Sequence, residues 1–307
     1  LMKENAFIVN CARGGIIDEE ALYTALSENK IGGAALDVYE NEPPKDNKLI
    51  TLDNIVLTPH IAASTKEAQK GAAIIVAEEI IDLNNGKTPK NVINLPRIDN
   101  RLKNELKPYM EVCERLGSFI SQSLKGKVKE VEIIYCGELA SLQNQDILGR
   151  CVLKGILDSI LNSSVNTVNS LNMAKTRGIK ITEGKTDNAK GYDSLVKVRA
   201  KSTKDSFSAE GTFIHEPKIV KVNEYWVDVK PSGNMFIAKY KDVPGTIGLI
   251  GTKLGEYKVN VGIMQVGRDV AGGEAIMILT LDHPVPDKVI KELIDLDYVF
   301  DATKLKL

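Results

Sequence analysis

The stretch NAFIVNCARGGIIDEEALYTALSENKIGGAALDVYENEPPKDNKLITLDNIVLTPHIAAST, residues 5–65, decides the fold of the chain. Three short apolar runs within it predict strands covered on both faces: residues 5–10, 34–39 and 54–59. Between the first two strands we predict a turn, a helix and a second turn, with Asp18 as the N-cap and Gly32 as the residue that ends the helix. This order is typical of the second half of a doubly wound (Rossmann-like) parallel α/β sheet.

A polar side chain follows each of these predicted strands. Arg13 follows the first strand, Glu42 the second and His60 the third. In an open parallel sheet, the carboxyl ends of the strands surround a ligand crevice. There a guanidinium can hold a carboxylate, and an imidazole beside an acidic group can move one proton. The pattern therefore predicts a site for a small carboxylic acid.

Each of these residues also has an ordinary interpretation. His60 could cap the helix that follows Thr65, Arg13 could be a surface arginine, and the carboxylate of Glu42 could be solvated in its proline-bounded turn. Asp37 interrupts an apolar strand, where a buried carboxylate needs a partner. No single residue favours a functional site by itself. The site is favoured because all three polar residues follow the ends of successive predicted strands.

The rest of the chain predicts two further domains. A helix over 65–83 and a proline-containing linker over 87–99 lead to a mixed α+β domain, and a hinge over 231–234 leads to a last unit of order βαββαβ, the ferredoxin-like arrangement. In the mixed domain, helices are predicted over 102–124, 146–161 and 165–176, and strands over 128–137, 180–182, 194–202, 206–214 and 217–229. The predicted domains span residues 1–95, 96–229 and 230–307.

Composition limits the classes of partner. The chain has 40 basic and 41 acidic residues, so it has no basic field to attract nucleic acid. No apolar run approaches the roughly 18–20 residues that cross a bilayer. The cysteines have irregular spacing and no CxxC pair, which indicates free thiols in a reducing compartment, the cytoplasm: Cys11, Cys113, Cys136 and Cys151.

A second candidate site lies in the last unit. Tyr240 and Asp242 close its first predicted strand, and Asn260 opens the next one. Together these side chains could bind a small amino acid through its ammonium, carboxylate and hydroxyl groups. The alternative is plain turn chemistry, because Asp and Asn both favour turns at such positions.

The motifs resemble a known enzyme family. NCARGGIIDEEAL, GGAALDVYENEPP and NIVLTPHIAAST resemble the catalytic segments of D-2-hydroxyacid dehydrogenases, and YKDVPGTIG and VNVGIMQVGR resemble an ACT domain. The middle domain resembles an allosteric substrate-binding domain. This combination is similar to the long-form phosphoglycerate dehydrogenases of that family, which act in serine biosynthesis with NAD as cofactor.

The resemblance implies a role for particular residues. Arg13 would orient the substrate, Glu42 would be the acidic partner, and His60 the proton donor and acceptor. Contacts to the nicotinamide half of NAD are implied for Cys11, Ala12, Arg13, Asp37, His60, Ile61, Ala62 and Ala63. Serine binding at ACT interfaces is implied for Tyr240, Asp242, Asn260 and Val261. An anion site is implied in the middle domain, with Lys175, Arg177 and Lys180 as candidates.

One feature of the family is missing from this sequence. GxGxxG is absent, and with it the glycine-rich loop whose N–H groups would bind the pyrophosphate of NAD. The first residues, LMKEN, read as the end of a helix that leads into a strand. We therefore expect the chain to begin inside a domain, as part of a larger enzyme.

The expected function is oxidation of 3-phospho-D-glycerate to 3-phosphohydroxypyruvate with NAD. Serine is expected to regulate it through the ACT domain, in a homo-oligomer, a tetramer, formed through the ACT and middle domains. The alternative is a regulatory or assembly fragment that binds serine but has no activity because the pyrophosphate loop is absent. A dehydrogenase-like corepressor is a third possibility, against which the amino-acid-sensing tail argues.

Overall fold

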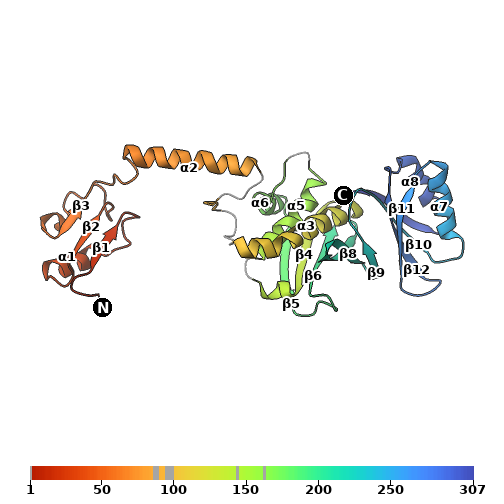
Figure 1. Cartoon of the computed structure of the whole chain (residues 1–307), viewed down its shortest axis with the longest axis horizontal. Coiled ribbons are helices and arrows are strands. Elements are labelled where there is room, and N and C mark those ends of the chain that lie inside the picture. Colours follow the sequence, from red (N-terminus) through yellow and green to blue (C-terminus); the bar gives the residue numbers. More distant parts are fainter. Residues whose placement is uncertain (1, 86–89, 94–99, 143–144, 162–163) are drawn as a thin grey trace. The chain divides into compact units, whose positions relative to one another are not determined.

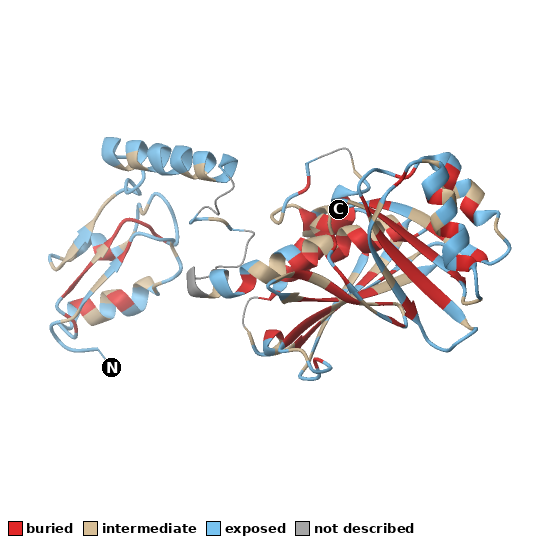
Figure 2. Ribbon diagram, turned by 45° about the vertical axis from the view of Figure 1, so that its right-hand side comes forward, coloured by how far each residue is buried: buried red, intermediate tan, exposed pale blue. Residues whose placement is uncertain are grey.

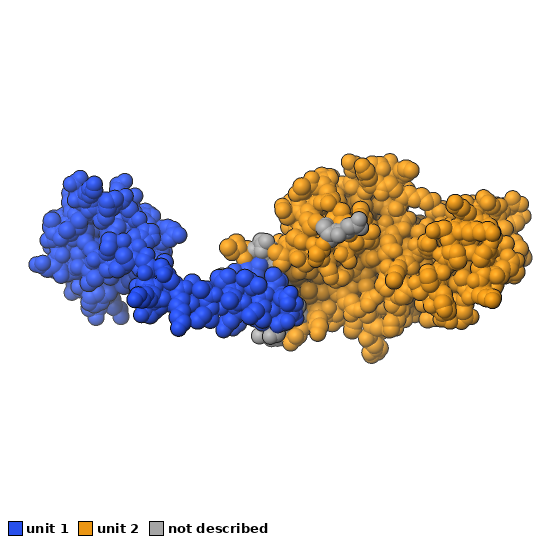
Figure 3. Space-filling view, turned by 90° about the horizontal axis from the view of Figure 1, so that it is seen from above, with its two compact units in different colours: residues 1–92 blue, residues 93–307 orange. Residues whose placement is uncertain are grey.

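The computed structural model describes residues 2–85, 90–93, 100–142, 145–161 and 164–307. The chain divides into two units, residues 1–92 and 93–307, which Figure 3 shows in different colours. The division falls within the predicted linker, whose prolines, Pro89 and Pro96, lie outside the described residues.

The first unit is built on a parallel sheet. Among its described residues, β1 (Phe7–Asn10), β2 (Gly33–Leu36) and β3 (Ile55–Leu57) pair in the order β1-β2-β3. Helix α1 (Glu19–Ser27) joins the first two strands, and a short 3-10 helix, η1 (Lys48–Thr51), precedes the third. The predicted α/β class is confirmed for this unit (Figure 1).

The start of α1 follows the prediction, and its end does not. Asp18 caps the helix, since its Oδ1 accepts a hydrogen bond from the backbone N–H of Ala21 at 2.9 Å. The expectation that Gly32 ends the helix was wrong, because the helix ends at Ser27. Asn29 takes the left-handed conformation there, with φ of 55°, which asparagine tolerates better than most residues.

The expectation that the strands are covered on both faces was also wrong for this chain. Phe7, Val9 and Val56 are 72%, 68% and 64% exposed, because α1 and η1 pack on the opposite face of the described sheet.

Helix α2 (Lys66–Asn84) forms where it was predicted, with Thr65 as its N-cap. None of its side chains is buried (Figure 2).

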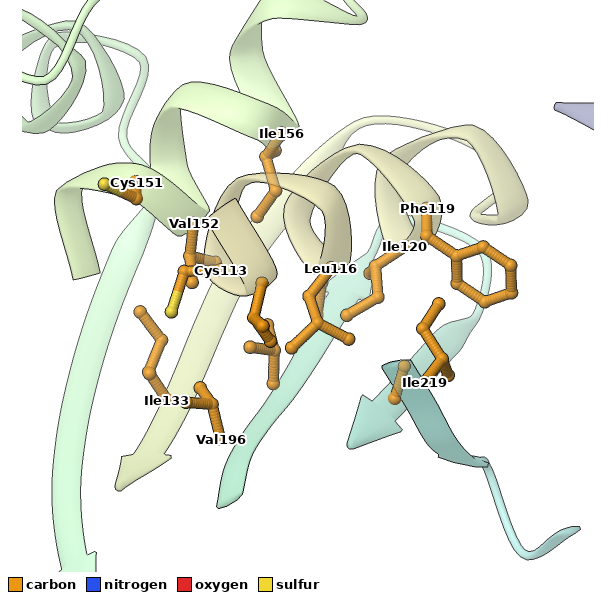
Figure 4. Close-up of a cluster of buried hydrophobic side chains, with 14 of the residues drawn as sticks. Cys113, Leu116, Phe119, Ile120, Ile133, Cys151, Val152, Ile156, Val196 and Ile219 are labelled. Atoms are coloured by element: carbon orange, nitrogen blue, oxygen red, sulfur yellow. The ribbon is translucent and has the colours of Figure 1, made fainter. Parts of the chain in front are cut away.

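The second unit contains a mixed sheet of order β5-β4-β6-β7-β8-β9, in which only the pairing of β4 with β5 is parallel. Its strands are β4 (Val128–Gly137), β5 (Lys180–Thr186), β6 (Ser194–Ser202), β7 (Ser206–Ile214), β8 (Glu216–Val222) and β9 (Tyr225–Val229). Its helices are α3 (Asn100–Ser123), α4 (Glu138–Ser141), α5 (Asp146–Asp158) and α6 (Ser170–Thr176). Side chains of α3 and α5 meet the inner face of the sheet in one core (Figure 4).

Several predicted elements of this domain differ from the structure. The strand predicted over 180–182 continues to Thr186, and the helix predicted over 146–161 ends at Asp158. The single strand predicted over 217–229 is a hairpin, with Asn223 in the left-handed conformation at its turn. The helix predicted from residue 165 begins only at Ser170. Before it, Asn166 and Asn169 bond each other's backbone N–H groups through their side chains, which stabilises a turn in place of a helix.

The last part of the second unit has the predicted ferredoxin-like arrangement, with an antiparallel sheet of order β11-β12-β10-β13. Its elements are β10 (Asn234–Lys241), α7 (Thr246–Glu256), β11 (Val261–Arg268), β12 (Glu274–Leu281), α8 (Asp287–Ile294) and β13 (Val299–Lys306). Both helices pack on one face of this sheet. The other face contributes to the core of the mixed domain through Met235, Ile237, Ile276, Ile278 and Leu305. The predicted domain boundary at residue 230 stays a prediction.

Candidate active site

The three predicted catalytic residues follow strands that end at one edge of the first sheet. Arg13 follows β1, Glu42 follows β2, and His60 follows β3. Because the three strands are parallel neighbours, their carboxyl ends lie side by side. The edge therefore gathers a guanidinium, a carboxylate and an imidazole from loops that are far apart in sequence.

Glu42 and His60 are in direct contact. Oε2 of Glu42 lies 2.7 Å from Nδ1 of His60, and its Oε1 accepts a hydrogen bond from the backbone N–H of Tyr39 at 3.1 Å. The His60 side chain is 46% exposed, so the ring is open to a ligand. With Nδ1 held by a carboxylate, Nε2 is the nitrogen left to exchange a proton.

The hydrogen bond from His60 lowers the pKa of Glu42 below its ordinary value, and the Tyr39 N–H acts in the same direction. A carboxyl group with a lowered folded-state pKa stabilises the fold above its unfolded pKa, and this contribution is lost as pH falls through the folded pKa. We expect the Glu42 carboxyl carbon to titrate by NMR below the ordinary pKa of a glutamate. In a His60→Asn variant its pKa should rise, and an unchanged midpoint would contradict the pairing.

Asp37 holds the segment that carries His60. Its buried carboxylate accepts hydrogen bonds from Thr58 Oγ1 at 2.6 Å, from the Ile61 N–H at 2.8 Å and from the Ala62 N–H at 2.9 Å. These hydrogen bonds lower the pKa of Asp37 below its ordinary value, and the bond from Thr58 has the largest effect. They also fix His60 in the left-handed conformation, with φ of 54°, which a non-glycine residue adopts only when its surroundings hold it.

Arg13 lies in a loop that presses against the loop of Glu42. A Cβ placed on Gly14 would lie 1.8 Å from the backbone oxygen of Tyr39, so the two loops touch at this glycine. The Arg13 side chain is exposed, and its Nη1 donates to the Ala12 carbonyl at 2.7 Å.

The residues predicted to contact the cofactor lie at the same edge of the sheet. Asp37 is buried, and the others are exposed: Cys11, Ala12, Arg13, His60, Ile61, Ala62 and Ala63.

Sequence reasoning missed two residues of this site. Asn10 binds the backbone of Ala12 and Arg13, and the Tyr39 hydroxyl donates to the Thr58 carbonyl at 2.8 Å. The signal available for Asn10 was an amide at the end of an apolar strand. No comparable signal existed for Tyr39, because its partner lies 19 residues away.

The predicted effector residues fall into two groups within one chain. Tyr240 is buried with a hydroxyl that has no partner among the described residues, and Asp242 forms an ion pair with Arg268 at 3.1 Å. Asn260 instead bonds Asp282. Strand β12 lies between β10 and β11, and the register sets Tyr240 level with Arg268 but Asn234 level with Val261. The two groups therefore lie at opposite ends of the sheet, about 20 Å apart.

Two of the three cations suggested for the middle domain have partners within the chain, and the anion site stays a prediction. Lys180 pairs with Glu130 at 3.2 Å, and Arg177 donates to the Met173 carbonyl at 3.4 Å. Lys175 lies in the last turn of α6. Among the described residues there is no group of three or more His, Cys, Asp or Glu that could hold a metal.

All four cysteines are free, with Cys11 exposed and the others buried. Within the part of the chain that the structure describes, no helix is long and apolar enough to cross a bilayer.

Three family models match successive parts of the chain. Residues 1–62 match the D-isomer specific 2-hydroxyacid dehydrogenase NAD-binding domain, so the first unit is similar to a segment of a dehydrogenase of this class. Residues 105–223 match the D-3-phosphoglycerate dehydrogenase intervening domain, and residues 235–297 match the ACT domain. Along its whole length, the chain resembles the D-3-phosphoglycerate dehydrogenases.

Curated relatives agree with this arrangement. A D-3-phosphoglycerate dehydrogenase of Methanocaldococcus jannaschii is 48% identical over 100% of this chain and 58% of its own length. Another from Archaeoglobus fulgidus is 40% identical over 100% of this chain and 59% of its own length. The chain thus spans about three fifths of these relatives. A solved D-lactate dehydrogenase with NAD+ from Lactobacillus jensenii is 30% identical over 30% of this chain and 32% of that one, with a TM-score of 0.24.

Proposed function

We propose that this chain is part of an NAD-dependent dehydrogenase that oxidises 3-phospho-D-glycerate to 3-phosphohydroxypyruvate in serine biosynthesis. The observation that carries the proposal is the 2.7 Å contact between Glu42 and His60 at the carboxyl edge of a parallel sheet. The match to the intervening domain and the names of the relatives support the choice of substrate.

In this proposal, each of the three strand-end residues has one part in the reaction. Arg13 holds the substrate carboxylate through paired N–H donors. Nε2 of His60 takes the proton of the C2 hydroxyl while the C2 hydrogen leaves as hydride and the carbon–oxygen bond becomes a carbonyl. The Glu42 carboxylate stabilises the imidazolium that results, because it lies against Nδ1.

NAD, when bound, supplies the hydride acceptor. The described residues fit its nicotinamide half, because Cys11–Ala12 and His60–Ala63 are exposed together at the strand ends. The Asp37 carboxylate lies beneath this surface, and after the bonds from Thr58, Ile61 and Ala62 one lone pair of its Oδ2 is left for an amide. The match to the NAD-binding family model supports this cofactor.

We further propose that L-serine regulates the enzyme at the ACT domain. Three features at one end of this domain support an amino-acid site: the unpartnered Tyr240 hydroxyl, the Asp242 carboxylate, and the start of α7, which has no side-chain cap. Asn260 and Val261 lie at the other end of the same sheet. A second copy running in the opposite direction would supply them, which is why a homo-oligomer, and a tetramer by resemblance, belongs to the proposal.

One alternative has an observation in its favour. GxGxxG is absent from the chain, so the chain by itself could be a regulatory and assembly fragment that binds serine and is catalytically incompetent. The four free cysteines support a reducing compartment, the cytoplasm, for either function.

Calorimetry separates the two readings. We expect L-serine to bind the chain saturably and Asp242→Asn to abolish the heat, because the ammonium loses its carboxylate. Asp287→Asn, which also removes an ion-paired carboxylate but on α8, should bind serine normally.

Serine binding without NAD binding would favour the fragment. NAD binding, together with NAD-dependent oxidation of 3-phospho-D-glycerate by the full natural polypeptide, supports the dehydrogenase, and no oxidation would contradict it.

A further inference from the structure

We propose that Asn10 is the positioning residue for Arg13, an inference that rests on the proposed dehydrogenase function. Asn10 is the last residue of β1 and is 7% exposed. Its Oδ1 accepts a hydrogen bond from the Ala12 N–H at 3.0 Å, and its Nδ2 donates to the Arg13 carbonyl at 2.9 Å. One side chain thus binds the backbone on both sides of the Ala12–Arg13 peptide.

An amide is suited to this task because it carries a donor and an acceptor in one plane. Asn10 is itself held in the sheet, since its carbonyl accepts a hydrogen bond from the Asp37 N–H at 3.0 Å. The loop that carries Arg13 is therefore tied to the rigid part of the unit. A binding group held this way keeps its geometry better than one on a free loop.

The far side of Arg13 is held by packing. Gly14 meets the backbone of Tyr39 with no space for a Cβ, and Gly15 has φ of 75°, which favours glycine. Arg13 lies between these glycines and the Asn10 amide, while its own side chain remains exposed. The backbone is therefore fixed on both sides of the one residue whose guanidinium must meet the substrate.

The test is steady-state kinetics of the full natural polypeptide with 3-phospho-D-glycerate and NAD. We expect Asn10→Ala to lower kcat/KM by about 10-fold or more, mainly through a higher KM for 3-phospho-D-glycerate, because a misplaced guanidinium binds the carboxylate poorly. The KM for NAD should stay within about 2-fold. Asn10→Asp keeps the size of the side chain and its acceptor but loses the donor to the Arg13 carbonyl, so it should raise the KM for 3-phospho-D-glycerate in the same way. This second variant tests the inference if Asn10→Ala does not fold.

Asn54→Ala is the matched control. The Asn54 Nδ2 also donates to a backbone carbonyl, that of Leu26 at 3.0 Å, but Asn54 precedes β3 and so lies at the amino end of the sheet. This variant should lose stability like Asn10→Ala yet keep the KM for 3-phospho-D-glycerate. Equal KM changes in both variants would show a general effect on folding and would overturn the inference.

A double-mutant cycle with Arg13 shows whether Asn10 acts through it. In an Arg13→Gln background, Asn10→Ala should change kcat/KM by less than about 2-fold, because no guanidinium is left to position. If Asn10→Ala lowers kcat/KM by the same factor in the Arg13→Gln background as in the wild type, the two residues act independently and the inference is overturned. If Arg13→Gln itself leaves kcat/KM normal, the proposed function fails. If Arg13→Gln is impaired while Asn10→Ala behaves like the wild type, only the role of Asn10 fails.

Discussion

Replacing His60 by asparagine should lower the turnover of the full natural polypeptide by about 100-fold or more, in line with the contribution of a general acid–base group. The amide of asparagine cannot take up the hydroxyl proton, and Glu42 loses the ring that it holds at 2.7 Å. Asparagine tolerates the left-handed backbone of this position, so the loop should keep its shape. The measurement is NAD-dependent oxidation of 3-phospho-D-glycerate.

His215→Asn is the matched control for this experiment. His215 is also exposed and also left-handed, with φ of 61°, but it lies at the turn between β7 and β8 in the second unit. Its replacement should leave turnover unchanged. Near-normal turnover of His60→Asn would remove His60 from the reaction and, with it, the central step of the proposed mechanism.

Gly155→Ala should destabilise the second unit by about 3 kcal/mol, the upper part of the usual range for overpacking. Gly155 lies where α5 crosses α3, and a Cβ there would lie 2.0 Å from the backbone oxygen of Glu114. Gly117 makes the reciprocal approach, with its Cβ position 2.2 Å from the Val152 oxygen. Backbone atoms cannot move aside as a side chain can, so the helices must separate. The two helices form the centre of the core (Figure 4), so separation exposes apolar surface.

Denaturant unfolding measures this effect, with the single tryptophan, Trp226 on β9, as the probe of the second unit. Gly251→Ala is the matched control, because Gly251 lies inside α7 and an added Cβ would meet nothing within 4 Å. It should stabilise the unit by about 0.5–1 kcal/mol through the helix propensity of alanine. A Gly155→Ala variant within about 0.5 kcal/mol of the wild type would contradict the close helix crossing.

The positions of the candidate site residues could be predicted from the sequence. The parallel pairing of β1, β2 and β3 brings Arg13, Glu42 and His60 to one edge of the sheet, as expected for residues that follow strand ends. Their roles in catalysis stay predictions until the kinetics are measured. The bonds that support them could not be predicted. Asn10 and Tyr39 bind backbone groups, and which backbone group comes within reach depends on turn conformations that are settled only when the loops pack together.

The amino-acid sequence by itself determined the elements whose causes are local. Asp18 and Thr65 cap their helices through side chains placed three residues before the N–H groups they bind. The order βαββαβ followed from periodicity and turn residues in the same way.

Only the tertiary structure decided which surfaces are covered and which groups meet. It left Phe7 and Val56 exposed, merged one face of the last sheet with the core of the mixed domain, and separated Tyr240 from Asn260 within one chain. The physical reason is that periodicity shows which face of an element is apolar, whereas burial depends on what packs against that face, and that partner comes from distant parts of the sequence.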